Sequence, residues 1–241
     1  MSTTIIRAAG NLEGALHETA KSIFATLKAQ GSEAPLTVGL CGGRSVVGLL
    51  SALEKESANQ PQDILKRIQF FMVDERLVPL TDEQSNYGGL KKLLFDALVE
   101  RGAVSEAQLH PFVCDSNLAD FGCAKYGEEL GGFGGRFTVV VLGVGEDGHV
   151  AGLFPRHPSL SVKGSGFVHF HDSPKPPADR MTASVGLIEG ADLSIVLALG
   201  EAKRAAWESF KAAGTAVADC PAIMATRAAS CVVVTDLEAA V

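Results

Sequence analysis

The sequence has little of what marks a membrane, secreted or metal-dependent protein. Its 241 residues contain no apolar run of about 18 residues, so no membrane-spanning helix is predicted. The five cysteines form no CxxC pair and are odd in number, which argues against a disulfide framework or a zinc site. No basic segment followed by an apolar core opens the sequence, so no secretory signal is predicted and we expect a cytoplasmic protein.

Positive charge is also scarce. The chain has 21 Lys and Arg against 28 Asp and Glu, which gives a formal net charge of -7. Nucleic-acid binding needs a basic surface to contact phosphates, so we expect no nucleic-acid partner. A small anionic ligand remains compatible with this balance, because a few convergent cationic side chains can hold one phosphate.

Apolar runs and amphipathic segments alternate along the chain. The runs predict strands over residues 36–40, 68–73, 137–142, 167–171, 193–199 and 231–235, and helical spacing predicts helices over 12–27, 46–53, 86–98 and 201–212. Continuous apolar strands separated by helices are typical of a parallel sheet covered on both faces. We therefore predict a single α/β domain over residues 1–241, with a mostly parallel, doubly wound, Rossmann-like sheet flanked by helices.

Four segments rich in Gly, His and charge follow predicted strands, after Leu40, Val73, Leu142 and Leu199. In a sheet of this kind, ligands bind beyond the carboxyl ends of the strands. The four segments are therefore predicted to converge on one site.

The first segment, Gly42-Gly43-Arg44-Ser45, joins a strand to a helix. Glycines there let backbone N–H groups approach an anion, and the helix N-terminus favours negative charge. The segment lacks the GxxxxGK[ST] pattern of a Walker loop, and a plain turn is the alternative.

The third segment matches GxGxxG at Gly143, Gly145 and Gly148. A dinucleotide site is not favoured, because the match lies in the middle of the chain and no acidic residue ends a strand about 20 residues later. The segment places Asp147 two residues before His149. An imidazole beside a carboxylate suits general-base catalysis, although a histidine that caps a turn is the alternative.

Other charged residues near strand ends are candidates with simple alternatives. Asp74 and Arg76 follow an apolar strand, where a solvated loop would also explain them. Lys203 begins a predicted helix and could face solvent. His169 and His171 alternate on one strand, but no third ligand stands at suitable spacing, so we expect no metal.

Longer stretches of the sequence resemble one enzyme family. The matching segments are residues 41–45 (CGGRS), 70–79 (FFMVDERLVP) with 85–86 (SN), 142–155 (LGVGEDGHVAGLFP) and 173–182 (SPKPPADRMT). They resemble 6-phosphogluconolactonase, in the branch related to glucosamine-6-phosphate isomerase. The chain departs from the family's usual Ser-Gly-Gly-Arg/Ser-Thr-Pro loop at Cys41, Ser45 and Val46.

The resemblance implies hydrolysis of 6-phosphoglucono-δ-lactone to 6-phosphogluconate in the oxidative pentose phosphate pathway, by a monomer without metal or organic cofactor. His149 would take a proton from water, Asp147 or Asp74 would orient the imidazole, and Arg76 would stabilise the carbonyl oxygen. The backbone and side chains of Gly43, Arg44 and Ser45 would hold the phosphate. The cationic side chains of Arg180 and Lys203 would contribute to the same site.

Two other functions fit the same resemblance less well. The sugar-phosphate isomerase branch carries an acid five residues after the motif histidine and a tyrosine after Asp-Glu, whereas this chain has Phe154 and Arg76. A non-catalytic sugar-phosphate sensor would usually carry a DNA-binding segment, and no basic helix-turn-helix is recognisable. Both functions remain alternatives to the lactonase.

Overall fold

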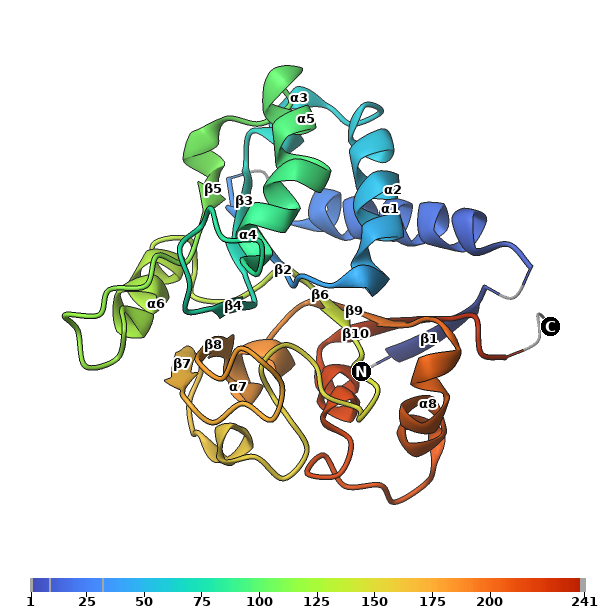
Figure 1. Ribbon diagram of the computed structural model, residues 1–241. Helices are drawn as coiled ribbons and strands as arrows, with labels where there is room; N and C mark the ends of the chain where they lie inside the picture. Colours follow the sequence, from blue (N-terminus) through green and yellow to red (C-terminus); the bar gives the residue numbers. More distant parts are fainter. Residues whose placement is uncertain (1, 9, 32, 239–241) are drawn as a thin grey trace.

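The computed structural model describes residues 2–8, 10–31 and 33–238, and its centre is a seven-stranded sheet (Figure 1). The strand order is β1-β10-β9-β6-β2-β3-β5, and each neighbouring pair is parallel. The bounds are β1 (Ser2–Arg7), β2 (Leu36–Leu40), β3 (Ile68–Met72), β5 (Leu109–His110), β6 (Val139–Gly143), β9 (Leu193–Ala198) and β10 (Ser230–Thr235). The predicted parallel sheet is confirmed.

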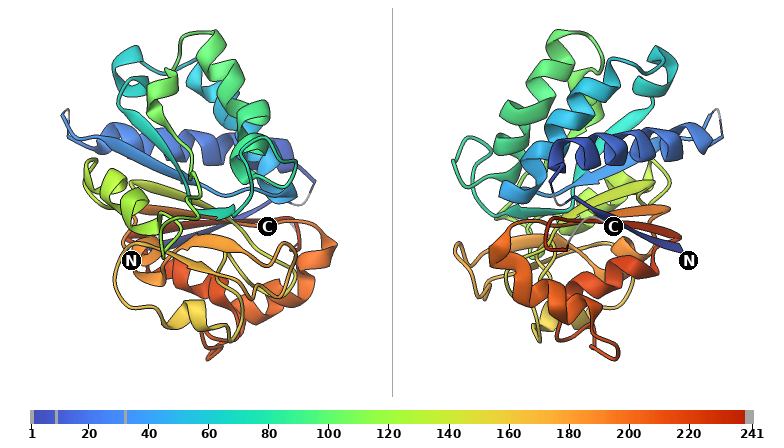
Figure 2. Two further views of the ribbon diagram at one scale, coloured as in Figure 1. Left: turned by 60° about the vertical axis from the view of Figure 1, so that its left-hand side comes forward. Right: turned by 90° about the vertical axis from the view of Figure 1, so that its right-hand side faces the viewer.

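Helices cover both faces of this sheet. They are α1 (Leu12–Ala29), α2 (Val47–Ser57), α3 (Gln62–Leu65), α4 (Asn86–Leu90), α5 (Asp96–Glu100), α6 (Cys123–Gly131), α7 (Val185–Glu189) and α8 (Arg204–Lys211). Helices α1 to α5 lie on one side, and α7 and α8 lie on the other (Figures 1 and 2). The predicted doubly wound α/β arrangement is therefore confirmed. None of the described helices combines the length and apolar composition needed to cross a membrane.

Shorter helical turns join these elements. A π-helical turn, η2 (Lys91–Phe95), continues α4 into α5, so the helix predicted over 86–98 is one interrupted helix. Turns of 3₁₀ type are η1 (Arg44–Val46), η3 (Glu106–Gln108), η4 (Pro158–Ser161), η5 (Glu201–Lys203) and η6 (Pro221–Arg227). Two of them, η1 and η5, begin just after strands of the central sheet, where the ligand site is expected.

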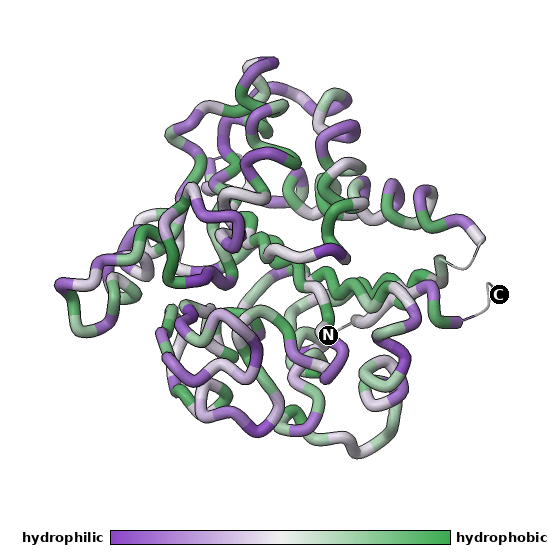
Figure 3. The backbone as a smooth tube through the Cα atoms, viewed as in Figure 1, coloured by the Kyte–Doolittle hydropathy of each residue, from purple (hydrophilic) through white to green (hydrophobic). Residues whose placement is uncertain are grey.

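The core is formed by the strands of the large sheet, which are the continuous hydrophobic band of Figure 3. In β6, Val139, Val140, Val141 and Leu142 are all fully buried. Such strands carry apolar side chains on both faces because helices cover both, which explains their unbroken apolar sequence. Helix α1 is apolar on one face only, and its buried positions include Leu16, which also reaches the rim of a large cavity.

The order of the strands reverses between β2 and β6. From β2 the chain proceeds through β3 to β5 in one direction, and from β6 it proceeds through β9 to β10 in the other. The carboxyl ends of β9, β6, β2 and β3 consequently lie side by side at this switch point, where open α/β sheets bind ligands. The predicted convergence of the four segments that follow these strands is confirmed.

A second, three-stranded antiparallel sheet was not predicted. Its order is β4 (Asp74–Arg76), β8 (Arg180–Ala183) and β7 (Phe167–Phe170). The strand expected over 167–171 exists, but it belongs to this small sheet and is only half-buried along most of its length. The same sheet shows that Asp74 and Arg76 lie in a strand and not in a solvated loop.

Candidate active site

A cavity of about 680 Å³ lies at the switch point of the sheet. Its lining includes every candidate site residue from the sequence except Asp147, which stands directly behind His149: Gly43, Arg44, Ser45, Asp74, Arg76, His149, Arg180 and Lys203. Lys175 adds a fifth cationic side chain to Arg44, Arg76, Arg180 and Lys203. The acidic residues Asp74, Glu146, Glu201 and Asp236 line the same cavity, so the five cations stand among carboxyl groups in a protein whose net charge is -7.

His149 and Asp147 form a hydrogen-bonded pair in the turn after β6. Asp147 Oδ1 lies 2.5 Å from Nδ1 of His149 and also accepts the backbone N–H of His149 at 3.3 Å. Within the described part of the chain no protein group bonds Nε2, and the ring lines the cavity. The sequence left open whether Asp147 or Asp74 orients the imidazole, and the geometry places Asp147 in that position.

Gly145 makes this placement of the imidazole possible. A Cβ added at Gly145 would lie 2.0 Å from Nδ1 of His149, closer than two unbonded atoms can approach. The backbone N–H of Gly145 also donates to the carbonyl of His149 at 2.8 Å, which closes the turn. The middle glycine of the GxGxxG match thus lets the histidine ring pack against the backbone.

The surroundings of Asp147 keep its carboxyl ionised. Burial opposes ionisation, but the hydrogen bond and charge of His149, together with Lys175, outweigh it and hold the pKa of Asp147 below its usual range. Nζ of Lys175 lies 3.6 Å from Asp147 Oδ1. The ring of Phe154 packs 4.6 Å from the imidazole, centroid to centroid. His149 thus contacts both a carboxylate and an apolar ring.

Asp74 is a second buried carboxyl group of the cavity. It begins β4 and is within electrostatic range of Arg76, Arg180 and His149. Burial raises the pKa of Asp74, and the nearby cations offset only part of this rise. Its backbone carbonyl accepts a 2.9 Å hydrogen bond from Asn86 Nδ2, which ties the strand to α4.

Glu75, the middle residue of β4, has a structural role. Its buried carboxylate accepts the backbone N–H groups of Asn86 and Tyr87, at 2.7 and 2.8 Å, and the hydroxyl of Ser85 at 3.1 Å. These bonds satisfy the free donors at the start of α4. Glu75 therefore anchors the segment that presents its neighbours Asp74 and Arg76.

Arg76 retains hydrogen-bonding capacity toward the cavity. One of its terminal nitrogens donates to the carbonyl of Gln84, which fixes the guanidinium. Its buried Nε has no partner among the described residues. A buried donor without a partner is costly, so Arg76 is held here at an energetic cost.

The segment after β2 has the geometry of an anion site. Gly43 has φ of +106°, a conformation that glycine adopts at little cost, and η1 begins at the next residue. Arg44 and Ser45 line the cavity. Cys41 stands where the family usually has serine, and its Sγ accepts the backbone N–H of Gly143 at 3.2 Å. Burial raises the pKa of the Cys41 thiol to about 12, so it stays neutral and braces β2 against β6.

Arg180 and Lys203 line the same cavity but have different neighbours. Burial and the adjacent Arg76 lower the pKa of Arg180. Burial also lowers the pKa of Lys203, where Glu146 opposes the change and Lys175 adds to it. The cations therefore form two groups, one around Arg76 and one around Lys203.

Two cavity residues were missed as site candidates. Lys175 lies in the proline-rich segment between β7 and β8, where periodicity gives no information on side-chain direction. Asn86 was recognised only as part of a family motif. His169 and His171 lie with their rings 5.3 Å apart, and His171 pairs with Asp179. Within the described residues no group of three or more His, Cys, Asp or Glu is arranged to hold a metal ion.

The chain is similar to known proteins over most of its length. A family model described as glucosamine-6-phosphate isomerases/6-phosphogluconolactonase matches residues 11–234. The chain is 33% identical over 202 residues to a 6-phosphogluconolactonase of Borreliella burgdorferi, covering 84% of each chain. It is 33% identical over 179 residues to that of Homo sapiens, covering 73% of this chain and 68% of the relative. The crystal structure of 6-phosphogluconolactonase from Thermotoga maritima superposes with a TM-score of 0.79 at 23% identity, covering 97% of this chain and 99% of the other.

Proposed function

The chain belongs to the family of glucosamine-6-phosphate isomerases and 6-phosphogluconolactonases, and we infer that it hydrolyses 6-phospho-D-glucono-1,5-lactone to 6-phospho-D-gluconate in the oxidative pentose phosphate pathway. The 6-phosphogluconolactonases of Borreliella burgdorferi and Homo sapiens support this reaction. The observation that carries it is the contact between His149 and Asp147 in a cavity lined by cations. We propose that a water molecule activated in this cavity attacks the lactone directly, without a covalent intermediate on the protein.

His149 acts as the general base. Because its Nδ1 faces Asp147, Nε2 is the nitrogen that takes the proton of a water molecule as that water attacks the lactone carbonyl. The carboxylate of Asp147 fixes the ring and stabilises the imidazolium that forms. A positioned base of this kind contributes roughly 10²–10⁴-fold to the rate.

Arg76 stabilises the charge that develops on the carbonyl oxygen. Its guanidinium is held by Gln84 and lines the cavity, where it can donate to that oxygen. Loss of one such donor costs on the order of 10²–10³-fold in rate. When the tetrahedral intermediate collapses, the bond to the ring oxygen breaks and His149 returns its proton to that oxygen. The product acid then ionises, so one proton is released per lactone.

The phosphate is held by donors that line the same cavity. Backbone N–H groups at Gly43, together with Arg44, Ser45, Arg180 and Lys203, supply the donors. Charge-assisted hydrogen bonds are worth roughly 1.5–3 kcal/mol each. Exposed charges beyond about 8–10 Å are screened by salt, so this local cluster outweighs the negative charge of the whole protein.

The isomerase alternative is disfavoured by the residue five positions after His149. The position five residues further along holds Phe154, which is buried and packs against the imidazole. A phenyl ring cannot relay a proton between sugar carbons. We further propose that residues 1–241 act as one domain and that the protein is cytoplasmic. We also propose that it is a monomer, because one chain supplies the residues that line the cavity. Light scattering of the purified protein tests the oligomeric state.

Proton release after addition of freshly prepared 6-phosphogluconolactone tests the proposed function. The purified protein should accelerate the release well beyond spontaneous hydrolysis, and His149→Gln should abolish most of that acceleration. His17→Gln is the matched control, because His17 lies on α1 and is not among the residues that line the cavity. Equal activity of the His149→Gln and wild-type proteins would overturn the assignment of the base.

A further inference from the structure

Lys175 lies near both the catalytic pair and Lys203. Its Nζ is 3.6 Å from Oδ1 of Asp147, the same oxygen that contacts Nδ1 of His149. Lys175 also lies close enough to Lys203 for the two charges to interact. One cation is thus shared between the catalytic pair and the group of cations proposed to bind phosphate.

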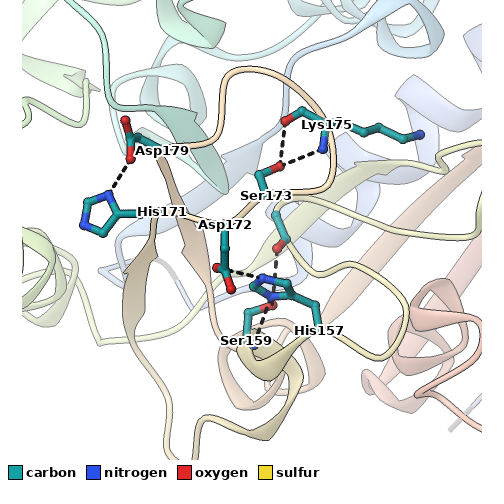
Figure 4. Close-up of polar contacts among 8 residues, drawn as sticks. His157, Ser159, His171, Asp172, Ser173, Lys175 and Asp179 are labelled. Carbon is teal, nitrogen blue, oxygen red and sulfur yellow. Dashed lines mark hydrogen bonds and ion pairs between the residues drawn. The ribbon is translucent and has the colours of Figure 1, made fainter.

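The loop that carries Lys175 is anchored at both ends (Figure 4). At its base, His171 pairs with Asp179 across the two ends of the loop. Next to this pair, Nε2 of His157 lies 3.0 Å from Asp172 Oδ1. These contacts hold the loop against the small sheet and against the segment that contains η4.

The backbone of Lys175 itself is also fixed. Ser173 Oγ donates to its carbonyl at 2.7 Å and accepts its N–H at 3.3 Å (Figure 4). Arg180 donates to three successive carbonyls, those of Lys175, Pro176 and Pro177, at 3.3, 3.0 and 3.0 Å. The side chain of Lys175, in contrast, is 40% exposed. Only the flexible four-carbon stem of the lysine is therefore free to redirect its ammonium group.

We propose that Lys175 is a positioning residue that makes catalysis by His149 and Asp147 depend on the phosphate of the substrate. The proposal rests on the proposed lactonase function. Without a phosphate, the ammonium of Lys175 shares the charge of Asp147 and opposes formation of an imidazolium at His149. A phosphate dianion bound beside Lys203 competes for this ammonium, and Asp147 then stabilises the imidazolium alone.

This arrangement favours phosphorylated lactones in kcat as well as in KM. A phosphate contact made equally in the ground state and in the transition state would change KM alone. Release of Asp147 from Lys175 acts on the proton-transfer step and therefore on kcat. The lysine thus gives the enzyme a way to reject lactones that carry no phosphate.

The proposal is tested by supplying the lactone ring and the phosphate group as two separate molecules, glucono-δ-lactone and phosphite dianion. Turnover of glucono-δ-lactone, which has no phosphate, is measured with and without added phosphite dianion for the wild-type protein and for Lys175→Met and Lys175→Arg. Phosphite should stimulate the wild type and Lys175→Arg by about three- to tenfold, the size expected for one ion pair near water. Lys175→Met should turn over glucono-δ-lactone faster than the wild type without phosphite, and phosphite should not stimulate it further.

The controls separate this role from simpler ones. Lys125→Met removes a lysine from α6 that does not line the cavity, and it should behave as the wild type. Slower turnover of both lactones by Lys175→Met, with or without phosphite, would show a purely structural role and overturn the proposal. Unchanged basal turnover with weaker phosphite binding would make Lys175 a simple phosphate ligand and overturn it too, as would a wild type that phosphite does not stimulate. A wild type that cannot hydrolyse the phosphorylated lactone would instead contradict the proposed function.

Discussion

Arg76 and Arg180 are direct partners in the antiparallel pairing of β4 with β8. Directly opposite residues on such strands lie close together, and like charges there are unfavourable. The charge of Arg76 lowers the pKa of Arg180, in addition to the effect of burial. The small sheet thus brings two guanidinium groups to one wall of the cavity, where Asp74 compensates them in part and an anionic ligand would complete the compensation.

The substitution Arg76→Met should lower kcat strongly while it changes the stability of the fold only slightly. Loss of the donor to the carbonyl oxygen should lower kcat by about 10²–10³-fold. The melting temperature should change by no more than about 4 °C, which corresponds to about 1 kcal/mol for a chain of this size, because relief of the repulsion from Arg180 offsets the lost bond to Gln84. Steady-state kinetics and calorimetry on one preparation measure both effects. A large loss of stability with unchanged kcat would contradict the proposed role.

The central sheet could be predicted from the sequence because its inner strands are buried on both faces and read as unbroken apolar runs. Strand β1 was missed because it lies at the edge of the sheet, where residues such as Thr3 and Thr4 are exposed. Strands β4 and β8 were missed because three or four residues are too few to show periodicity. Short strands of this kind are specified by their partners and not by their own composition.

The site was predictable where its residues directly follow apolar strands, and less so elsewhere. Arg44, Asp74 and His149 were found in this way. The choice of Asp147 as the partner of His149 depends on a side-chain contact within a turn, which spacing alone does not reveal. Lys175 reaches the cavity from a loop outside the large sheet, so the rule on strand ends does not apply to it.

Asp74→Asn should stabilise the protein at neutral pH. Because the pKa of Asp74 is raised in the folded state, the protonated carboxyl favours folding, and this contribution is lost as pH rises through the folded-state pKa. Asparagine cannot ionise, so the variant should melt at a higher temperature than the wild type at pH 7. The difference should disappear below about pH 4, where the unfolded wild type is also protonated. Melting curves across this pH range check the sign. A variant that is less stable than the wild type at pH 7 would contradict the argument.

Lys203→Ala and Arg180→Ala should affect the kinetics differently. Lys203 is proposed only to bind phosphate, so its loss should raise KM by about one to two decades with little change in kcat. Arg180 also lies opposite Arg76 in the small sheet, so its loss should disturb the donor to the carbonyl oxygen and should raise KM and lower kcat together. Glucono-δ-lactone is the control substrate, because without a phosphate it should be insensitive to Lys203→Ala. Identical kinetic profiles for the two variants would argue against the second role of Arg180.

Gly145→Ala should impair catalysis without removing any catalytic group. The added Cβ would lie 2.0 Å from Nδ1 of His149 and 2.7 Å from Oδ1 of Asp147, so the contact between the two side chains must be disturbed. Misplacement of a base by about 1 Å can cost about 10²-fold, and we expect a fall in kcat of that order. Gly127→Ala is the matched control, because a Cβ at this position in α6 meets no atom within 4 Å. Full activity in Gly145→Ala would show that the observed imidazole position is not required for turnover.

Glucosamine 6-phosphate should inhibit lactone hydrolysis competitively and should release no ammonia. Its phosphate can use the same donors, so the sugar should occupy the cavity. Isomerisation would also require ring opening and proton transfer between carbons, and those steps need a second acid near His149. Phe154 fills the corresponding wall of the cavity and packs 4.6 Å from the imidazole, so no such acid is positioned there. Unphosphorylated glucosamine is the control and should inhibit far more weakly. An ammonia-coupled assay on the same enzyme preparation decides between the two branches of the family. Ammonia release at a rate comparable to lactone hydrolysis would overturn the lactonase assignment.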